Sequence, residues 1–170
     1  YYFSKTYIRL WIPMLRFGCD VEASAVQAKG KRHMDNQEYN QAEYEYSKAL
    51  NVYRKYLVYA NPNKYEPILA LLLGEMSELY VKTECLGRAE EKCIEAITIY
   101  EKIVKKKTKK IEPKLANMLI SLAKIYVKAN QLEKAEETYT RAWMLLKRLT
   151  DENAEKHIEV LISSLYDCAY

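Results

Sequence analysis

The sequence predicts an all-α fold, and three observations support the prediction. The 170 residues include only 4 Gly and 4 Pro, too few turn residues for the many short strands of a sandwich or barrel. Apolar residues recur at spacings of three and four, the period of one face of a helix. Blocks of sequence also repeat every 46 to 47 residues, which indicates helical hairpins stacked in series.

The first helix of each repeating unit is expected to begin near a proline. A proline in the first helical turn loses no hydrogen bond, because its missing N–H would have no partner there. Pro67 and Pro113 suit this place and stand 46 residues apart. The apolar face of this helix comprises Leu69, Leu72, Leu73, Met76 and Tyr80 in one copy and Leu115, Leu119, Leu122, Ile125 and Tyr126 in the next.

The second helix follows a short turn and is expected to begin with a capping box. Asp35 lies three residues before Glu38, and Asn130 lies three before Glu133, the spacing of reciprocal side-chain caps. Small residues alternate with large ones, so that two antiparallel helices can approach closely. The apolar face comprises Ala42, Tyr46, Ala49, Tyr53 and Tyr56, then Ala89, Cys93, Ala96, Tyr100 and Ile103, then Ala135, Tyr139, Ala142, Leu146 and Leu149.

One hairpin cannot bury its own apolar face, so the copies must stack on one another. The period divides the chain into three repeats, at residues 23–62, 63–108 and 109–154. Residues 1–22 are expected to hold the tail of a preceding repeat and a linker, and residues 155–170 the first helix of a truncated fourth repeat. We therefore expect an internal segment of a longer array.

The order of small and aromatic residues resembles that of the tetratricopeptide repeat. The period exceeds the 34 residues usual in that family, and in this respect the chain is similar to the long-repeat, kinesin-light-chain type. The resemblance implies a right-handed α-α superhelix. The matching columns are Gly30, His33, Ala42, Tyr46 and Ala49; Ser77, Tyr80, Ala89, Cys93 and Ala96; Ala123, Tyr126, Ala135, Tyr139 and Ala142.

In tetratricopeptide repeats the first helices line a concave groove that holds a peptide or a helical segment of a partner protein. The resemblance thus implies a non-catalytic interaction scaffold that combines polar and apolar contacts. A solvated inner face without a ligand is the competing interpretation. The family's groove positions correspond to Gln27, Lys31, Met34, Leu71, Glu78, Val81, Asn117, Ile120, Lys124 and Val127.

Some members of the family clamp the C-terminal carboxylate of chaperones with Lys and Asn at fixed first-helix columns. That set of residues is not reproduced here, so the acidic tails of chaperones are not expected partners. The corresponding columns carry Gln27, Lys31, Glu75, Asn117 and Ser121.

Composition leaves little for catalysis, so no enzyme, cofactor or metal site is expected. The chain has 2 His and 4 Cys without a C-x-x-C pair, and it lacks a glycine-rich phosphate loop and an H-E-x-x-H motif. Ser121 and Lys124 form an S-x-x-K pattern, but its usual partner motifs are missing. The thiols are expected to be reduced core residues: Cys19, Cys85, Cys93 and Cys168.

The net charge of +4 conceals a strongly basic stretch. Residues 102–114 hold seven Lys and one Glu, an excess of +6, which leaves −2 for the rest of the chain. Lysines without interleaved aromatic or arginine residues give only salt-sensitive, nonspecific attraction to nucleic acid. We expect a solvated connection between hairpins and no specific nucleic-acid partner.

The remaining expectations concern compartment, tyrosine content and the wider role of the chain. No run reaches the ~18 apolar residues of a membrane span, and a cytoplasmic location is expected. The 16 Tyr are interpreted mainly as interface residues with solvated hydroxyls, with an aromatic binding surface as the alternative.

The alternative to an interaction scaffold is a regulatory or structural segment of a larger multidomain protein. This alternative includes self-association through uncapped ends.

Overall fold

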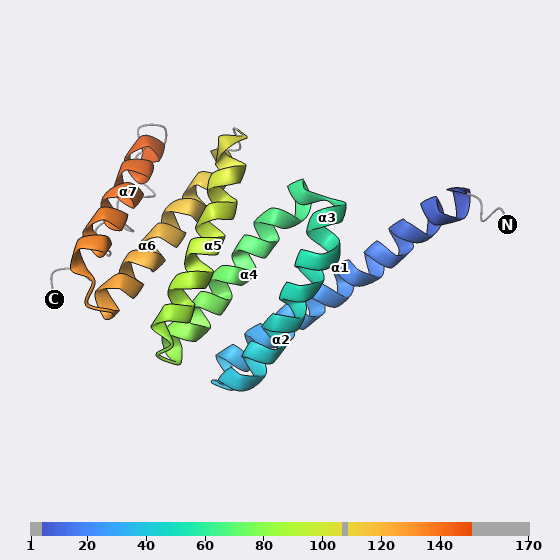
Figure 1. The fold of residues 1–170 in the computed structure, drawn as a ribbon, viewed down its shortest axis with the longest axis horizontal. Helices are drawn as coiled ribbons and strands as arrows, with labels where there is room; N and C mark the ends of the chain where they lie inside the picture. Colours follow the sequence, from blue (N-terminus) through green and yellow to red (C-terminus); the bar gives the residue numbers. More distant parts are fainter. Residues whose placement is uncertain (1–4, 107–108, 151–170) are drawn as a thin grey trace. The chain divides into compact units, whose positions relative to one another are not determined.

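The computed structural model describes residues 5–106 and 109–150, with side chains from residue 18 onward except for residues 107–109 and 150. Within these ranges the chain forms helices and no strand, which confirms the all-α prediction. The elements are α1 (Lys5–Asp35), α2 (Tyr39–Val52), the π-helix η1 (Tyr53–Leu57), α3 (Val58–Ala60), α4 (Pro62–Lys82), α5 (Leu86–Lys105), the 3₁₀ helix η2 (Lys109–Ile111), α6 (Glu112–Lys128) and α7 (Leu132–Thr150) (Figure 1).

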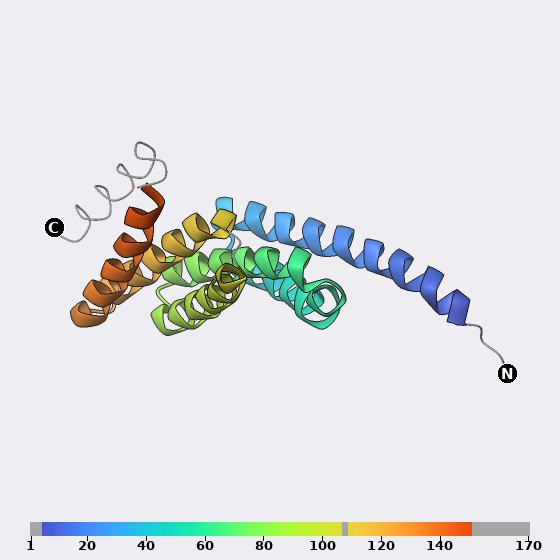
Figure 2. The same ribbon diagram turned by 90° about the horizontal axis from the view of Figure 1, so that it is seen from above.

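The chain divides into two compact units, Tyr1–Leu79 and Tyr80–Tyr170. In the first unit α1 packs against α2 and η1, and in the second α6 packs against both α5 and α7. The α6–α7 pair lies side by side in two perpendicular views (Figures 1 and 2). Each unit therefore contains a helical hairpin of the expected kind.

The core of both units consists of the apolar faces expected from the sequence. Every predicted first-helix residue from Leu69 to Tyr80 and from Leu115 to Tyr126 is buried. The predicted second-helix residues from Ala42 to Tyr53 and from Ala89 to Ile103 are buried as well. In the third copy Ala135, Ala142 and Leu146 are buried, whereas Tyr139 and Leu149 are half-buried. Small-to-large alternation at helical spacing therefore identified the packed faces.

Close approach of α1 and α2 depends on a glycine. A Cβ atom at Gly30 would lie only 2.7 Å from Cδ1 of Tyr46, and Tyr46 is 1% exposed. The absence of a side chain at Gly30 makes room for the tyrosine ring. This contact joins two of the small and aromatic columns that carry the family resemblance.

Three hairpin turns repeat the same backbone geometry. In the first, the Glu38 N–H donates to the His33 carbonyl at 2.8 Å, and Gln37 takes a left-handed φ of 62°. A backbone hydrogen bond to the carbonyl five residues earlier, next to a single left-handed residue, defines the Schellman motif at the C-terminus of a helix. In the second turn Glu84 is left-handed, with a φ of 58°, and the Cys85 N–H donates to the Tyr80 carbonyl at 2.8 Å. In the third turn Asn130 is left-handed, with a φ of 56°, and the Gln131 N–H donates to the Tyr126 carbonyl at 2.9 Å.

The predicted capping boxes are wrong, because this turn occupies three residues before the next helix begins. Asp35 is the last residue of α1, and Glu38 is the N-cap of α2 without a side-chain hydrogen bond. Asn130 is the left-handed residue after α6. Asx residues tolerate the left-handed conformation, so Asn130 serves the end of one helix rather than the start of the next.

The start of α4 differs from the expected one. The helix begins at Pro62, and Pro67 lies inside it. Asn61 is the cap, since its Oδ1 accepts the N–H of Lys64 at 3.2 Å, and Pro62 follows in the first helical position. Pro113 does lie at the start of α6, as predicted.

Helix α1 runs from Lys5 to Asp35 without a break. Residues 5–22 and the predicted first helix of the first repeat belong to this one helix. The expected truncated repeat at residues 155–170 lies outside the described residues.

A π-helix changes the register of the second helix in the first unit. The N–H of Val58 bonds to the carbonyl of Tyr53, a step of five residues instead of four. As a result Leu57 is fully buried, and Tyr56, predicted to lie on the apolar face, is 50% exposed. A regular helix would have placed position 56 inward.

Candidate functional site

The predicted groove residues of the first unit lie on α1 and α4, and their exposure differs. Lys31 and Glu78 are exposed, and Leu71 is 44% exposed. Gln27 is half-buried, whereas Met34 is only 9% exposed. Met34 therefore contributes to the core and offers little area to a ligand.

A hydrogen-bonded chain of side chains connects α1 and α4 at this face. The Tyr53 hydroxyl donates to Oε1 of Gln27 at 3.3 Å, and Nε2 of Gln27 donates to Oε2 of Glu75 at 2.9 Å. Burial raises the pKa of the Glu75 carboxyl, while the Gln27 bond and the nearby Lys31 charge lower it. Gln27 thus orients a half-buried carboxylate that our predicted set did not include.

The phenol of Tyr46 lies in acidic surroundings. Burial raises the pKa of Tyr46 well above its ordinary value, and the charges of Glu75, Glu78 and Asp35 add to this effect. The phenol therefore stays protonated and can act as a hydrogen-bond donor throughout the physiological pH range.

In the second unit the predicted groove residues lie on α6 and at the end of α4. Asn117 and Lys124 are exposed on α6, two helical turns apart, and Val81 and Val127 are half-buried. Ile120 is 8% exposed and belongs to the core, like Met34. Asn117, Lys124 and Val127 remain as accessible contacts on α6.

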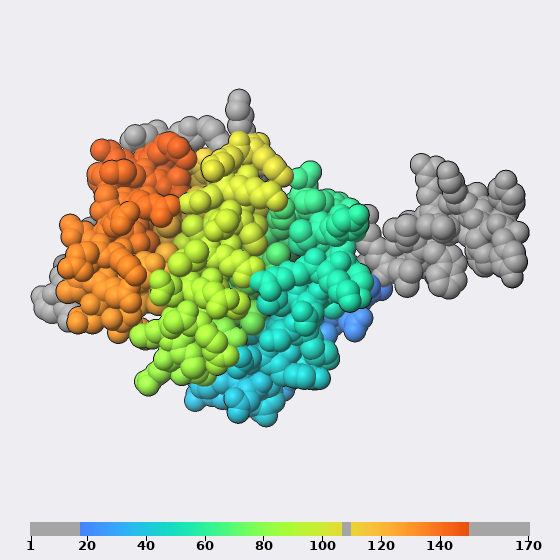
Figure 3. All heavy atoms as spheres, viewed as in Figure 1, coloured from blue at the N-terminus to red at the C-terminus, as the bar shows by residue number. Residues whose placement is uncertain are grey.

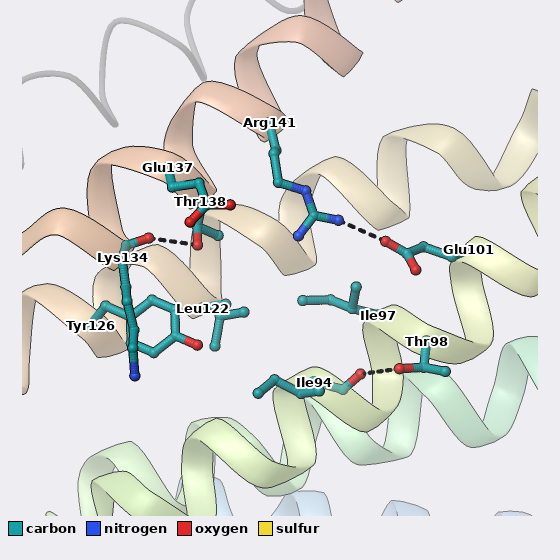
Figure 4. A pocket seen from close by; sticks show the side chains of 10 residues that line it. All are labelled: Ile94, Ile97, Thr98, Glu101, Leu122, Tyr126, Lys134, Glu137, Thr138 and Arg141. Atoms are coloured by element: carbon teal, nitrogen blue, oxygen red, sulfur yellow. Dashed lines mark hydrogen bonds and ion pairs between the residues drawn. The ribbon is translucent and has the colours of Figure 1, made fainter. Parts of the chain in front are cut away.

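A cavity of about 410 Å³ opens elsewhere in the second unit and is lined by residues of α5, α6 and α7. Figure 4 shows the walls that α5 and α7 form. On each of these helices the lining residues follow the spacing i, i+3, i+4 and i+7, which is one face of a helix. None of the predicted groove residues lines it. The lining residues are Ile94, Ile97, Thr98 and Glu101 on α5, Leu122 and Tyr126 on α6, and Lys134, Glu137, Thr138 and Arg141 on α7.

The cavity combines an apolar interior with charged edges. The Thr98 and Thr138 hydroxyls donate to carbonyls of their own helices at 2.9 Å and 2.7 Å, so they offer no hydroxyl hydrogen to a ligand. Arg141 Nη2 lies 2.8 Å from Glu101 Oε1 across the cavity (Figure 4). Both partners are partly exposed, so this ion pair can open at small cost.

Tyr126 lies beside the charged residues of this cavity. The Lys134 ammonium lies 5.4 Å from the centre of its ring, a cation–π distance. Burial raises the pKa of Tyr126 to about 12, and the charge of Glu90 adds to this effect.

The sequence contained a signal for this cavity in the helical spacing of positions 94, 97, 98 and 101 and of positions 134, 137, 138 and 141. The signal was not recognised, because polar and apolar residues are mixed at these positions of both helices.

The thiols differ from the expectation in part. Cys93 is buried and its Sγ donates to the Met118 carbonyl at 3.4 Å, as a core thiol should. Cys19 and Cys85 are only half-buried, and Cys168 lies outside the described residues. Among the residues with described side chains, no three His, Cys, Asp or Glu gather as potential metal ligands.

Comparison with known proteins leaves the family undetermined. No protein-family model matches the chain, and no curated protein matches its sequence. Over the described ranges, no helix is both long enough and apolar enough to cross a membrane.

Proposed function

We propose that the chain is a tetratricopeptide-like helical-repeat module that binds a peptide or helical segment of a partner protein without catalysing a reaction. The observation that carries the proposal is the triple occurrence of one turn geometry at Gln37, Glu84 and Asn130. Their separations of 47 and 46 residues equal the sequence period. Helical hairpins repeated in this way typically stack as an α-α superhelix with an extended binding surface.

The accessible first-helix residues have the mixed chemistry that such a surface needs. Lys31, Asn117 and Lys124 provide charge and an amide for orientation, while Leu71 and Val127 provide apolar contact. Polar groups fix the register of a bound segment and apolar contacts supply affinity. Gln27 and Glu75 add a preformed hydrogen-bond network.

The proposal can be tested by panning a displayed peptide library against purified protein. The test variant carries Lys31→Glu, Asn117→Ala and Lys124→Glu. A matched control carries Lys106→Glu, Asn63→Ala and Lys110→Glu, the same changes at exposed positions outside the groove columns. A further variant, Lys134→Glu with Arg141→Glu, alters the cavity between α5 and α7.

We expect peptides enriched by the unmodified protein and the control but not by the groove variant. Helicity of all proteins is compared by circular dichroism, so that loss of folding is recognised. Peptides that are retained by the groove variant and released by the cavity variant would move the binding site to α5 and α7. The proposal fails if no protein enriches peptides, or if all proteins enrich the same ones.

A further inference from the structure

The exposed side of α2, η1 and α3 carries both tyrosines and lysines. Three of its tyrosines are among the most exposed large side chains: Tyr44 at 63%, Tyr56 at 50% and Tyr59 at 90%. Atoms of these helices lie on the viewed side of the first unit in Figure 3. We call this set Tyr44, Lys48, Asn51, Lys55, Tyr56 and Tyr59 the tyrosine–lysine face.

All residues of the tyrosine–lysine face except Tyr56 lie on one side of the helix, opposite the core. Five of the buried positions, 42, 46, 49, 53 and 57, are each followed two residues later by an exposed one, at 44, 48, 51, 55 and 59. Two residues correspond to roughly 200° of rotation on a helix of 3.6 residues per turn. The five exposed side chains therefore form a continuous stripe.

The cations lie against the rings. The Lys48 ammonium is 5.3 Å from the centre of the Tyr44 ring, and the Lys55 ammonium is 5.4 Å from that of Tyr56. Each pair presents a positive charge beside an exposed aromatic face.

The segment that carries this face beyond Glu45 has no acidic residue of its own, although Lys48 pairs with Glu45 at 3.6 Å and Lys64 with Asp20 at 2.6 Å. Residues 46–65 contain Lys48, Arg54, Lys55 and Lys64 but neither Asp nor Glu. Glu45, on α2, is 4% exposed and pairs more closely with Lys29 from α1, at 2.5 Å, than with Lys48. The stripe therefore combines exposed tyrosine rings with the positive charges of Lys48 and Lys55, of which Lys48 also lies near Glu45.

We propose that the tyrosine–lysine face binds single-stranded nucleic acid, with bases stacked on the exposed tyrosines and phosphates neutralised by Lys48 and Lys55. Base stacking on aromatic side chains combined with a cationic track is how proteins hold single strands with little sequence preference. The surface lies on a second helix and is separate from the residues proposed to bind a peptide, so either function can hold without the other. It also differs from the lysine run at residues 102–114, which has no tyrosine among its members.

The test measures fluorescence anisotropy of a labelled single-stranded oligothymidine titrated with protein at several salt concentrations. We expect Tyr44→Ala with Tyr59→Ala to weaken binding by roughly fivefold or more, the lower limit for loss of one stacked base. Tyr44→Phe with Tyr59→Phe keeps the rings and should bind like the unmodified protein. All four changes are at exposed positions, and circular dichroism checks the fold.

A second pair of variants tests the charges. Lys48→Gln with Lys55→Gln should reduce the salt dependence by about 1.4 in the slope of log K against log salt, about 0.7 for each single-strand phosphate that is no longer neutralised. Lys106→Gln with Lys110→Gln removes the same charge from the lysine run and should leave the slope unchanged.

Four results would overturn the proposal. They are equal binding by the alanine and phenylalanine variants, equal loss from both lysine pairs, equally tight binding of a duplex of the same length, and no binding at low salt. A tyrosine-dependent association with vesicles of anionic lipid in place of the oligonucleotide would assign the face to a membrane surface instead.

Discussion

The first hairpin, α1 with α2, and the third, α6 with α7, share one turn geometry but fill their helix interfaces differently. A constant offset of 93 residues relates them, so that Gly30 and Tyr46 correspond to Ala123 and Tyr139. Tyr46 is 1% exposed, whereas Tyr139 is half-buried. The Tyr46 ring is fully buried against Gly30, whereas the Tyr139 ring, whose corresponding residue is Ala123, is only half-buried.

The same offset relates a charged contact to an uncharged one. Lys29 pairs with the buried Glu45 at 2.5 Å in the first hairpin, and the corresponding residues of the third are Leu122 and Thr138. Both members of the second pair are buried. One backbone arrangement thus carries either an ion pair, with Lys29 53% exposed, or two buried uncharged side chains at the corresponding positions.

The largest effect is expected where the first hairpin has no room. Gly30→Ala places a methyl group against the Tyr46 ring and should lower the free energy of unfolding by about 1–3 kcal/mol, as overpacking of a core does. Gly18→Ala is the matched control, because a Cβ there meets no atom within 4 Å. It should leave stability unchanged or raise it by up to about 1 kcal/mol. Denaturant unfolding measures both, and equal effects would contradict the close approach.

A smaller effect is expected from the ion pair. Lys29→Ala leaves the Glu45 carboxylate with only the more distant Lys48, 3.6 Å away, and should cost about 1–2 kcal/mol. Lys29→Leu with Glu45→Thr copies the third hairpin and should restore most of that stability. A double-mutant cycle gives the coupling, and a double variant as unstable as the sum of the single ones would show that the two interfaces are not interchangeable.

The pH dependence sharpens the same comparison. The Lys29 hydrogen bond holds the pKa of Glu45 below its ordinary value of 4.5 in the folded state. This stabilisation is complete above pH 4.5 and is lost as the pH falls through the lower, folded-state pKa. The double variant should therefore lose less stability on acidification, as measured by thermal unfolding below pH 5.

The smallest effect is expected at the turns. Gln37 and Asn130 have the same left-handed backbone, but asparagine adopts it more readily than glutamine. Gln37→Gly should raise the free energy of unfolding by about 0.5–1 kcal/mol, and Asn130→Gly by less than about 0.5 kcal/mol. Differential scanning calorimetry compares them, and a larger gain at Asn130 would contradict the argument.

The sequence was informative where one residue type has one physical role. Alternating small and large residues such as Ala42 and Tyr46 predicted the buried face, because close helix packing requires that alternation. The helix starts were harder, since Asp35 and Asn130 suit a cap by composition but lie at the end of the preceding helix. The position of the left-handed turn residue decides between these roles. Gln37 and Glu84 do not indicate it in the sequence, because neither is a residue type that favours the left-handed conformation.

The candidate sites were less predictable than the core. Exposure within a helix face depends on neighbouring helices, so Met34 and Ile120 could not be distinguished from Leu71 by spacing alone. The tyrosine–lysine face had a sequence signal in the acid-free segment 46–65. That signal was obscured because Tyr46 and Tyr53 on the same helix are core residues.

The π-helix at Tyr53–Leu57 coincides with a one-residue change in the spacing between the first two copies of the repeat. Upstream of it the first and second copies are 47 residues apart, as between the buried Tyr53 and Tyr100, and downstream they are 46 apart, as between the buried Leu57 and Ile103. A wider helical turn absorbs the extra residue where it occurs. The packed faces on either side therefore keep their alignment with those of the second copy, even though the two copies differ by one residue in length.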